Sequence, residues 1–367
     1  MIQENKPRIL NIVDNRWWSG TAYFAIYATK ALHDFSLTSD IVGDHGTLAI
    51  KKAKELGLNV LSGFNPRSNN PLKYYSELAG LLNLIRDGRY THLIPHGPPS
   101  HFWASRAKKR LGDKIKVIRA LSDNMTPKVN IISKSIYRKY TDYFIASSET
   151  LVKTFSKAFD IPRTEFKSLL GPLDMTELNF SSISDRKENN QVVFGLIARL
   201  SPVKGHSLFL KAAALALKKN NALKFLISGE EVQIKKSDLQ DSAENLGISD
   251  RVQIVDNFDH VSAALSEVDV GVIPSLFSEV ICRIGMEFMA SGKAVIASDV
   301  NVLPELVIHG ETGLIFNSED EVALSEAILK LAEDEELRKK YGIAGRKRAE
   351  DLFSIEKFAA QLASILE

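Results

Sequence analysis

Residues 278–298, "SEVICRIGMEFMASGKAVIAS", form a mostly apolar stretch that carries two carboxylates, Glu279 and Glu287, eight positions apart. The run at 281–290 is typical of a buried helix, and the run at 294–297 that follows is typical of a strand. A carboxylate buried in such a helix costs several kcal/mol unless a partner hydrogen-bonds it. The partner of Glu287 is therefore either a neighbouring Lys or Arg or the hydroxyl groups of a ligand.

The same alternation of short β-branched runs with longer helical patterns continues through the chain. Helices are expected, for example, at 21–35, 207–219 and 260–267. Strands are expected at 8–14, 91–97, 114–120, 142–148, 192–198, 223–229, 251–257, 270–275 and 294–298. Apolar strands separated by helices predict parallel sheets covered on both faces. The predicted fold class is α/β, with two Rossmann-like domains facing across a cleft that holds a ligand beyond the carboxyl ends of the strands.

The domain boundaries follow from a polar segment at 173–190 that interrupts the periodicity and is interpreted as a linker. It separates an N-terminal domain at 1–172 from a C-terminal domain at 191–352. The last residues, 353–367, predict a helix with Ser354 as its N-cap and one apolar face. We expect this helix to cross back to the N-terminal domain.

The composition is that of a globular protein: 44% of the 367 residues are hydrophobic and 25% are charged. No apolar run approaches the roughly 20 residues that a membrane span needs. The start of the chain lacks the pattern of a signal peptide. The single cysteine, Cys282, excludes an internal disulfide and a cysteine-based metal cluster. These features predict a cytoplasmic protein, and no nucleic-acid partner is expected.

Charge is unevenly distributed although the net charge is only +2, because residues 101–170 hold 15 Lys and Arg against 6 Asp and Glu. This basic stretch predicts an anionic partner, such as phospholipid headgroups or a phosphorylated acceptor, or is simply a solvated face. Trp103 and Tyr137 are expected beside the basic residues on helix surfaces. If the acceptor is linked to a lipid, the basic and aromatic residues favour reversible, peripheral association with the anionic inner face of the cell membrane.

A second motif, "ARLSPVKGHS" at 198–207, places Arg199 and Lys204 between the end of a strand and the start of a helix. Two cations at this point form an anion site, or are two solvent-facing basic residues in a loop. The motif lies in the same predicted sheet as Glu279 and Glu287. One edge of that sheet can therefore hold both pairs.

These motifs resemble a known family. "GLIARLSPVKGHSLFLKAA" (195–213), the 278–298 stretch and "LPELVIHGETGLIF" (303–316) resemble the C-terminal domain of family-4 retaining glycosyltransferases of the GT-B fold. "WWSGTAYFAIYATKAL" (17–32) and "SIYRKYTDYFIASSETLVKTF" (135–155) resemble its N-terminal domain. The resemblance implies transfer of a sugar, with retention, from a nucleotide-sugar donor to a glycan or lipid-linked acceptor. A fainter likeness favours the synthesis of bacterial lipopolysaccharide or other surface glycans.

The resemblance also implies roles for particular residues. The N-terminal domain would bind the acceptor and the C-terminal domain the donor. Arg199 and Lys204 would hold the donor diphosphate and stabilise its developing charge, Glu287 would accept hydrogen bonds from the ribose, and Glu279 would contact the transferred sugar. Further donor contacts are expected at Gly20 and at the backbone of Ile281, Cys282 and Arg283. No cofactor and no metal ion are expected.

Departures from the family pattern leave parts of the site open. Ile281 and Cys282 stand where many members have Phe-Gly, and Glu230 and Glu231 stand where a second glycine is common. At the end of the strand at 114–120, where members often have a histidine, this chain has Ser122.

His96 is the nearest alternative, and it is interpreted either as a catalytic residue or as a structural loop residue. A nucleotide-sugar epimerase of the same fold and a non-catalytic nucleotide-sugar-binding module remain the alternative functions.

Overall fold

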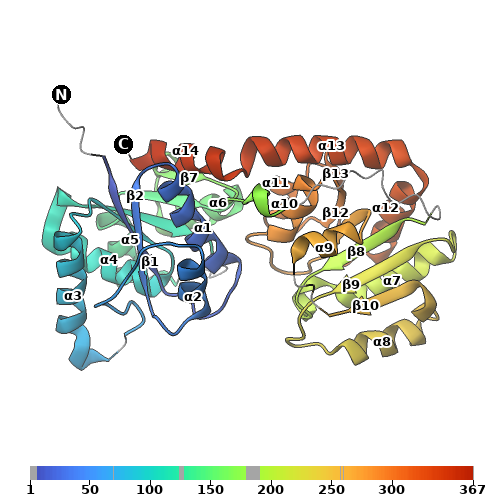
Figure 1. Ribbon diagram of the computed structural model, residues 1–367, viewed down its shortest axis with the longest axis horizontal. Coiled ribbons are helices and arrows are strands. Elements are labelled where there is room, and N and C mark those ends of the chain that lie inside the picture. The colour runs from blue at the N-terminus through green and yellow to red at the C-terminus, as the bar shows by residue number, and fades with distance from the viewer. Residues whose placement is uncertain are drawn as a thin grey trace. The chain divides into compact units, whose positions relative to one another are not determined.

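The structure is a computed structural model that describes residues 6–68, 70–123, 128–178, 191–256, 258 and 260–366. The chain divides into two compact units, shown in Figure 1. Unit 1 consists of Met1–Pro172 with Ser354–Glu367, and unit 2 consists of Leu173–Phe353. Both are α/β units built on a parallel sheet, which confirms the predicted fold class.

Unit 1 contains a seven-stranded parallel sheet in the order β3-β2-β1-β4-β5-β6-β7. The strands are β1 (Arg8–Val13), β2 (Thr38–Gly43), β3 (Val60–Leu61), β4 (His92–Pro95), β5 (Lys116–Leu121), β6 (Tyr143–Ala146) and β7 (Phe166–Ser168). The α-helices are α1 (Gly20–Asp34), α2 (Leu48–Glu55), α3 (Tyr74–Asp87), α4 (Pro98–Leu111), α5 (Ile131–Lys139), α6 (Glu149–Phe159) and α14 (Ile355–Leu366). The strand order reverses between β1 and β4, and ligands of open α/β sheets generally bind beyond the carboxyl ends of the strands at such a reversal.

The core of unit 1 is largely aromatic and aliphatic. Trp103 on α4 packs edge-on against Phe64, and Tyr137 on α5 stacks on Phe159. Both side chains were expected on helix surfaces, but they are buried. That expectation was wrong because both aromatic rings pack into the hydrophobic core of unit 1, while Lys109, Arg110, Arg138 and Lys139 stay exposed. Helix α14 is held to this unit by Phe358, which meets Phe24 on α1 edge to face.

Unit 2 contains a six-stranded parallel sheet in the order β10-β9-β8-β11-β12-β13. The strands are β8 (Val193–Ile197), β9 (Lys224–Ser228), β10 (Val252–Val255), β11 (Val270–Ile273), β12 (Ala294–Ser298) and β13 (Gly313–Phe316). The α-helices are α7 (His206–Leu217), α8 (Lys236–Asn245), α9 (Val261–Ser266), α10 (Arg283–Ala290), α11 (Leu303–Leu306), α12 (Glu321–Glu333) and α13 (Glu335–Leu352). Here the order reverses between β8 and β11.

The strands expected from β-branched runs all form, with ends that differ by at most two residues from those expected. Strands β2, β3, β7 and β13 were not expected. β3 has two residues and β7 has three, which is too short for a periodic pattern. Of the predicted linker, residues 179–190 lie outside the described residues. Its first residue, Leu173, donates its backbone N–H to the carbonyl of Phe353 over 2.6 Å. This hydrogen bond joins the first and last residues of unit 2.

Candidate active site

The loop after β8 carries the predicted anion site of unit 2. It passes through a single 3-10 turn at Pro202–Lys204 and reaches Gly205, which has a left-handed φ of 73°. A Cβ at Gly205 would lie 1.9 Å from the carbonyl oxygen of Pro274, so only glycine fits here. The backbone N–H of Leu276 also donates to the carbonyl of Val203 over 3.0 Å. The loops after β8 and β11 are therefore in direct contact.

This contact brings together two of the predicted site residues. Lys204 Nζ lies 2.5 Å from Glu279 Oε2, and Ser275 Oγ donates to the same oxygen over 2.7 Å. Glu279 is only 5% exposed. A charge-assisted pair with a further hydroxyl donor explains how this buried carboxylate is accommodated. The cluster lies beyond the carboxyl ends of the two strands at which the sheet order reverses.

Arg199, the other predicted cation, does not join this cluster. Its side chain is exposed, and among the described residues it makes no hydrogen bond or ion pair. A guanidinium that is free of protein partners keeps all its donors available for an anion. The geometry is thus compatible with the predicted role, which stays a prediction.

Glu287 has a protein partner. The Nε atom of Arg283, one turn earlier on α10, donates to Glu287 Oε1 over 2.6 Å. Glu287 is 3% exposed. Of the two partners considered for Glu287, a neighbouring cation and the hydroxyl groups of a ligand, the structure shows the first, so the carboxylate does not depend on a ligand for a partner. Its contact with a ribose stays a prediction. The spacing of four residues on a helix brings the two side chains together without any ligand.

The segment between the two acids is largely enclosed. Ile281 and Cys282 are buried, and α10 begins at Arg283. Burial, together with the nearby Glu279 carboxylate, raises the pKa of the Cys282 thiol above its usual range. The thiol is therefore protonated at neutral pH.

In unit 1, Gly20 is the first residue of α1, which is capped by the Ser19 hydroxyl. The imidazole of His96 has no exposed area and contacts Asn11 Oδ1 through Nε2 over 3.0 Å. Burial, with a smaller contribution from Arg119, lowers the pKa of His96 to about 3. His96 is neutral at pH 7 and fully buried, so it would contact a sugar only if the residues around it moved. Its catalytic role stays a prediction.

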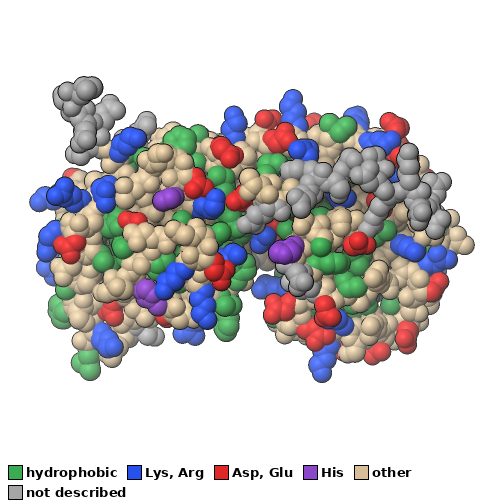
Figure 2. All heavy atoms as spheres, viewed as in Figure 1, with side chains coloured by type: hydrophobic (Ala, Val, Ile, Leu, Met, Phe, Trp, Pro, Cys, Tyr) green, Lys and Arg blue, Asp and Glu red, His purple; other side chains and the backbone are tan. Residues whose placement is uncertain are grey.

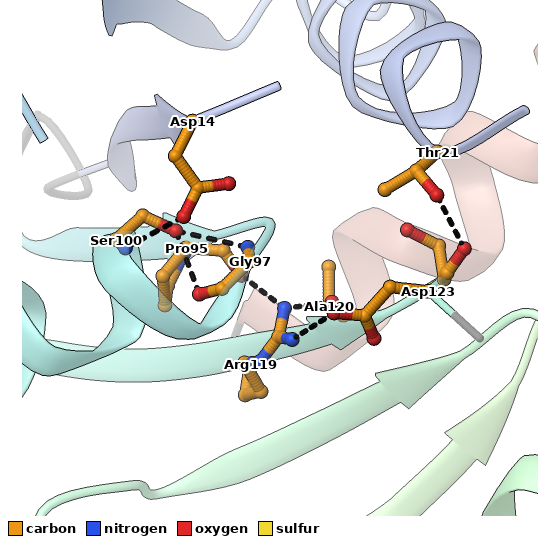
Figure 3. A network of polar contacts seen from close by, with 9 residues as sticks. Asp14, Thr21, Pro95, Gly97, Ser100, Arg119, Ala120 and Asp123 are labelled. Carbon is orange, nitrogen blue, oxygen red and sulfur yellow. Dashed lines mark hydrogen bonds and ion pairs between the residues drawn. The ribbon is translucent and has the colours of Figure 1, made fainter. Parts of the chain in front are cut away.

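Ser122, which stands where the family often has a histidine, is also buried. Its carbonyl accepts a 2.8 Å hydrogen bond from Thr21 Oγ1, which ties the loop after β5 to the start of α1 (Figure 3). Its hydroxyl has no partner among the residues that the structure describes.

Sequence reasoning missed a charged network centred on Arg119 (Figure 3). This arginine is completely buried in β5. Its Nη2 lies 3.1 Å from Asp123 Oδ2, and its Nη1 donates to the carbonyls of Pro95, at 3.2 Å, and Ala120. The network links the carboxyl ends of β4 and β5. The signal in the sequence was a single arginine inside the apolar strand "KVIRAL".

Asp14, at the carboxyl end of β1, lies close to the same network. Its Oδ2 accepts a 2.8 Å hydrogen bond from the backbone N–H of Ser100 at the start of α4. A Cβ at Gly97 would lie 2.0 Å from the carboxylate, so glycine allows the close approach. Burial raises the pKa of Asp14, against the opposing effects of Ser100 and Arg119. Three chain segments therefore place polar groups at the carboxyl edge where the strand order of unit 1 reverses.

Comparison with known proteins identifies the class of the second unit. Residues 179–348 match the model of the family "Glycosyl transferases group 1". The second unit is therefore similar to group 1 glycosyltransferases.

Among curated proteins, a D-inositol 3-phosphate glycosyltransferase of Corynebacterium glutamicum is 31% identical over 179 residues, which are 47% of this chain and 42% of that protein. The chain thus matches less than half the length of this relative. The lipopolysaccharide core biosynthesis mannosyltransferase LpsB of Rhizobium meliloti is 24% identical over 311 residues, covering 78% of this chain and 86% of that protein.

Solved structures show the same fold at low sequence identity. The UDP complex of HepE from Anabaena has a TM-score of 0.83 and 19% identity, covering 98% of this chain and 99% of that chain. A glycosyltransferase from Rickettsia africae has a TM-score of 0.85 and 17% identity, covering 99% and 98%. The fold is therefore that of GT-B glycosyltransferases.

Proposed function

We propose that the protein is a retaining glycosyltransferase that moves a sugar from a nucleoside diphosphate sugar to an acceptor hydroxyl. The observation that carries this proposal is the Lys204–Glu279–Ser275 cluster at the strand reversal of a group 1 glycosyltransferase unit. A cation and a hydrogen-bonding carboxylate side by side suit a ligand that joins a diphosphate to a polyhydroxyl ring.

The proposed chemistry assigns each group a task. The bond between the anomeric carbon and the β-phosphate oxygen breaks, and the nucleoside diphosphate leaves with both electrons of that bond. Lys204 and Arg199 stabilise the negative charge that builds on the leaving oxygen. The acceptor oxygen bonds to the anomeric carbon on the same face, and its proton passes to the departing phosphate. Glu279 accepts hydrogen bonds from hydroxyls of the transferred sugar and so fixes its orientation.

Among nucleotides, UDP is the first candidate. Solved complexes of HepE, whose fold this chain shares, contain UDP or UDP-glucose. The acceptor is proposed to be a bacterial surface glycan, supported by the likeness to LpsB and, in fold, to the lipopolysaccharide galactosyltransferase WaaB.

The test is a screen of UDP-, GDP- and ADP-sugars with and without acceptor extracts. Transfer to an acceptor, with an unchanged anomeric configuration by NMR, would support the proposal. Interconversion of donor sugars without transfer would identify an epimerase. Tight nucleotide binding without any turnover would identify a binding module, and an inverted product would contradict retention.

A lipid-linked acceptor would require approach to a membrane surface. On the face shown in Figure 2, basic and acidic side chains are interspersed over both units. The residues just before α5 and its first turn expose three apolar side chains, Val129, Ile131 and Ile132, of which Ile131 is 88% exposed. The exposed cations Lys128, Lys134, Arg138 and Lys139 lie on the same short segment. Among the described residues no helix combines the length and apolar character that crossing a bilayer requires.

We therefore propose that α5 rests on an anionic membrane, with its isoleucines at the headgroup level and its cations near lipid phosphates. Ile131→Ser/Ile132→Ser should release the protein from liposomes that contain anionic lipid, and high salt should do the same. The matched control is Ile343→Ser, which removes a 72% exposed isoleucine on α13 of unit 2. Equal binding to zwitterionic liposomes, or equal loss in both variants, would contradict the assignment.

A further inference from the structure

Asn301 occupies an unusual backbone position in the loop after β12. Its φ is 47°, in the left-handed region that most side chains avoid. Asparagine is among the non-glycine residues that enter this region most readily. A glycine would meet the same backbone requirement more easily, so the choice of asparagine points to a use for its side chain.

That side chain holds the backbone of Glu279. Asn301 Oδ1 accepts the backbone N–H of Glu279 over 3.0 Å, and the N–H of the next residue, Val302, donates to the Glu279 carbonyl over 3.2 Å. Two successive residues of one loop thus bind both backbone polar groups of the acid. With Asn301 in the left-handed conformation, its side chain and the N–H of Val302 reach the Glu279 backbone at the same time.

The same two loops are joined at further points. Ser298 Oγ, at the end of β12, donates to the carbonyl of Ser275 over 2.6 Å, and Ser275 Oγ in turn donates to the Glu279 carboxylate. Ser318 Oγ, after β13, donates to the carbonyl of Leu276 over 3.0 Å. The segment from Ser275 to Glu279 is therefore held along its length by the loops after β12 and β13.

We propose that Asn301 is a positioning residue for Glu279. Its amide oxygen fixes the Glu279 backbone, so that the carboxylate stays between Lys204 and Ser275 and faces the transferred sugar. The inference rests on the proposed function, because it takes the sugar hydroxyls as the ligand of Glu279. Asn301 itself touches no substrate, and its effect passes entirely through the acid that it holds.

The central test compares Asn301→Gly with the wild-type protein. Glycine keeps the left-handed backbone and removes the Asn301 side chain with the amide oxygen that Glu279 uses, so the fold should be retained. We expect kcat for transfer to fall about 10–100-fold, the scale of a small misplacement of a group that orients the substrate. Affinity for UDP alone, measured by calorimetry, should stay within about twofold, while the extra affinity that UDP-glucose gains from its sugar is lost. Unchanged kcat and sugar-dependent affinity would overturn the proposal.

Two further variants separate positioning from a general structural role. Asn301→Asp keeps an acceptor oxygen and the left-handed turn, so it should recover most of the lost kcat. In a Glu279→Ala background, Asn301→Gly should lower kcat by less than about twofold, because the acid through which it acts is absent. An additive loss in the double variant would show that Asn301 acts independently of Glu279.

A measurement that needs no turnover keeps this inference separate from the proposed function. Amide hydrogen exchange in a peptide covering residues 275–283 should be faster in Asn301→Gly than in the wild type, because the Glu279 N–H loses its acceptor. Unchanged exchange would contradict the positioning role whatever the enzyme does. If wild-type protein turns over no nucleotide sugar but exchange rises as expected, the proposed function fails and the contact stands as a structural one, which overturns the catalytic part of the inference.

Discussion

Lys204 Nζ lies 2.5 Å from Glu279 Oε2, so the ammonium and carboxylate charges neutralise each other. The ammonium group has three donors, and only one of them is directed at this carboxylate oxygen. A diphosphate that arrives next to Lys204 can take the remaining donors without displacing Glu279. In the proposed reaction, the pair holds the Glu279 carboxylate where the hydroxyl groups of the transferred sugar would meet it.

Replacing Lys204 should affect both stability and catalysis. Lys204→Met leaves Glu279, which is 5% exposed, without its cation, and should cost about 1–3 kcal/mol of the free energy of unfolding. It should also lower kcat by roughly 10²–10³-fold, because charge on the leaving phosphate is no longer stabilised. Denaturant unfolding and steady-state kinetics measure the two effects.

Arg199→Ala is the matched control for this variant. Its side chain is exposed and makes no hydrogen bond or ion pair within the described chain, so its removal should leave the free energy of unfolding nearly unchanged. A comparable fall in kcat would then be due to the lost interaction with the donor. Full activity of an Arg199→Ala/Lys204→Ala double variant would eliminate this edge of the sheet as the donor site.

The Arg283–Glu287 pair should contribute to stability in the absence of any ligand. Glu287→Gln removes the charge that binds Arg283 Nε and should lower the free energy of unfolding by about 1–3 kcal/mol. In a double-mutant cycle with Arg283→Met, the two losses should be clearly less than additive. Calorimetric titration of Glu287→Gln with UDP then asks whether a ribose also uses this acid. Additive losses would show that the contact contributes little.

Acid should destabilise the protein through its buried histidines. Burial lowers the pKa of His96 to about 3 and those of His92 and His206 to about 4, from an ordinary value of 6.5. The unfolded chain binds these protons and the folded chain does not, so stability is complete above pH 6.5 and falls below it. Each histidine contributes a slope of about 1.4 kcal/mol per pH unit within its window.

His96→Gln isolates one of these protons. Urea unfolding of the variant at several pH values between 4 and 6.5 should show a slope that is smaller by about one proton than that of the wild type. An identical slope in both proteins would mean that His96 takes up a proton in the folded state. The activity of this variant would also show whether the enclosed imidazole has any part in catalysis.

Removing the buried guanidinium of unit 1 should be the most damaging single change to that unit. Arg119→Met leaves the Asp123 carboxylate and the carbonyl of Pro95 without a donor, at an expected cost of about 3–5 kcal/mol. Asp123→Asn, which keeps the shape but removes one charge, should cost less. Thermal unfolding compares the two variants, and equal melting temperatures for Arg119→Met and the wild type would contradict the network's structural role.

The parts of this structure that were predictable from sequence are those in which neighbouring residues determine the outcome. Strands with β-branched runs were predicted correctly. The sequence also predicted that the motif with Lys204 and the stretch with Glu279 belong to one sheet, and they lie after β8 and β11 of unit 2. The partner of Glu287 could also be inferred from the sequence, because Arg283 stands four residues before it in the same predicted helix. The family resemblance pointed instead to the ribose of a ligand.

What the sequence did not disclose depends on contacts between distant segments. Arg119 appeared as one polar residue in an apolar strand, and its partners come from loops that only the strand order brings together. Asn301 lies 22 positions after Glu279, and no pattern in the sequence around either residue predicts their contact. The left-handed turn that unites them is a backbone property that a side-chain pattern does not encode.

Cys282 gives the protein a built-in reporter. It is the only thiol in the chain, it is buried at the start of α10, and its raised pKa keeps it in the unreactive protonated form. A thiol reagent can therefore modify the native protein only during moments when the start of α10 opens. The labelling rate therefore reports how often this segment opens, and a donor that contacts Glu279 and Glu287 should lower that rate in proportion to its occupancy.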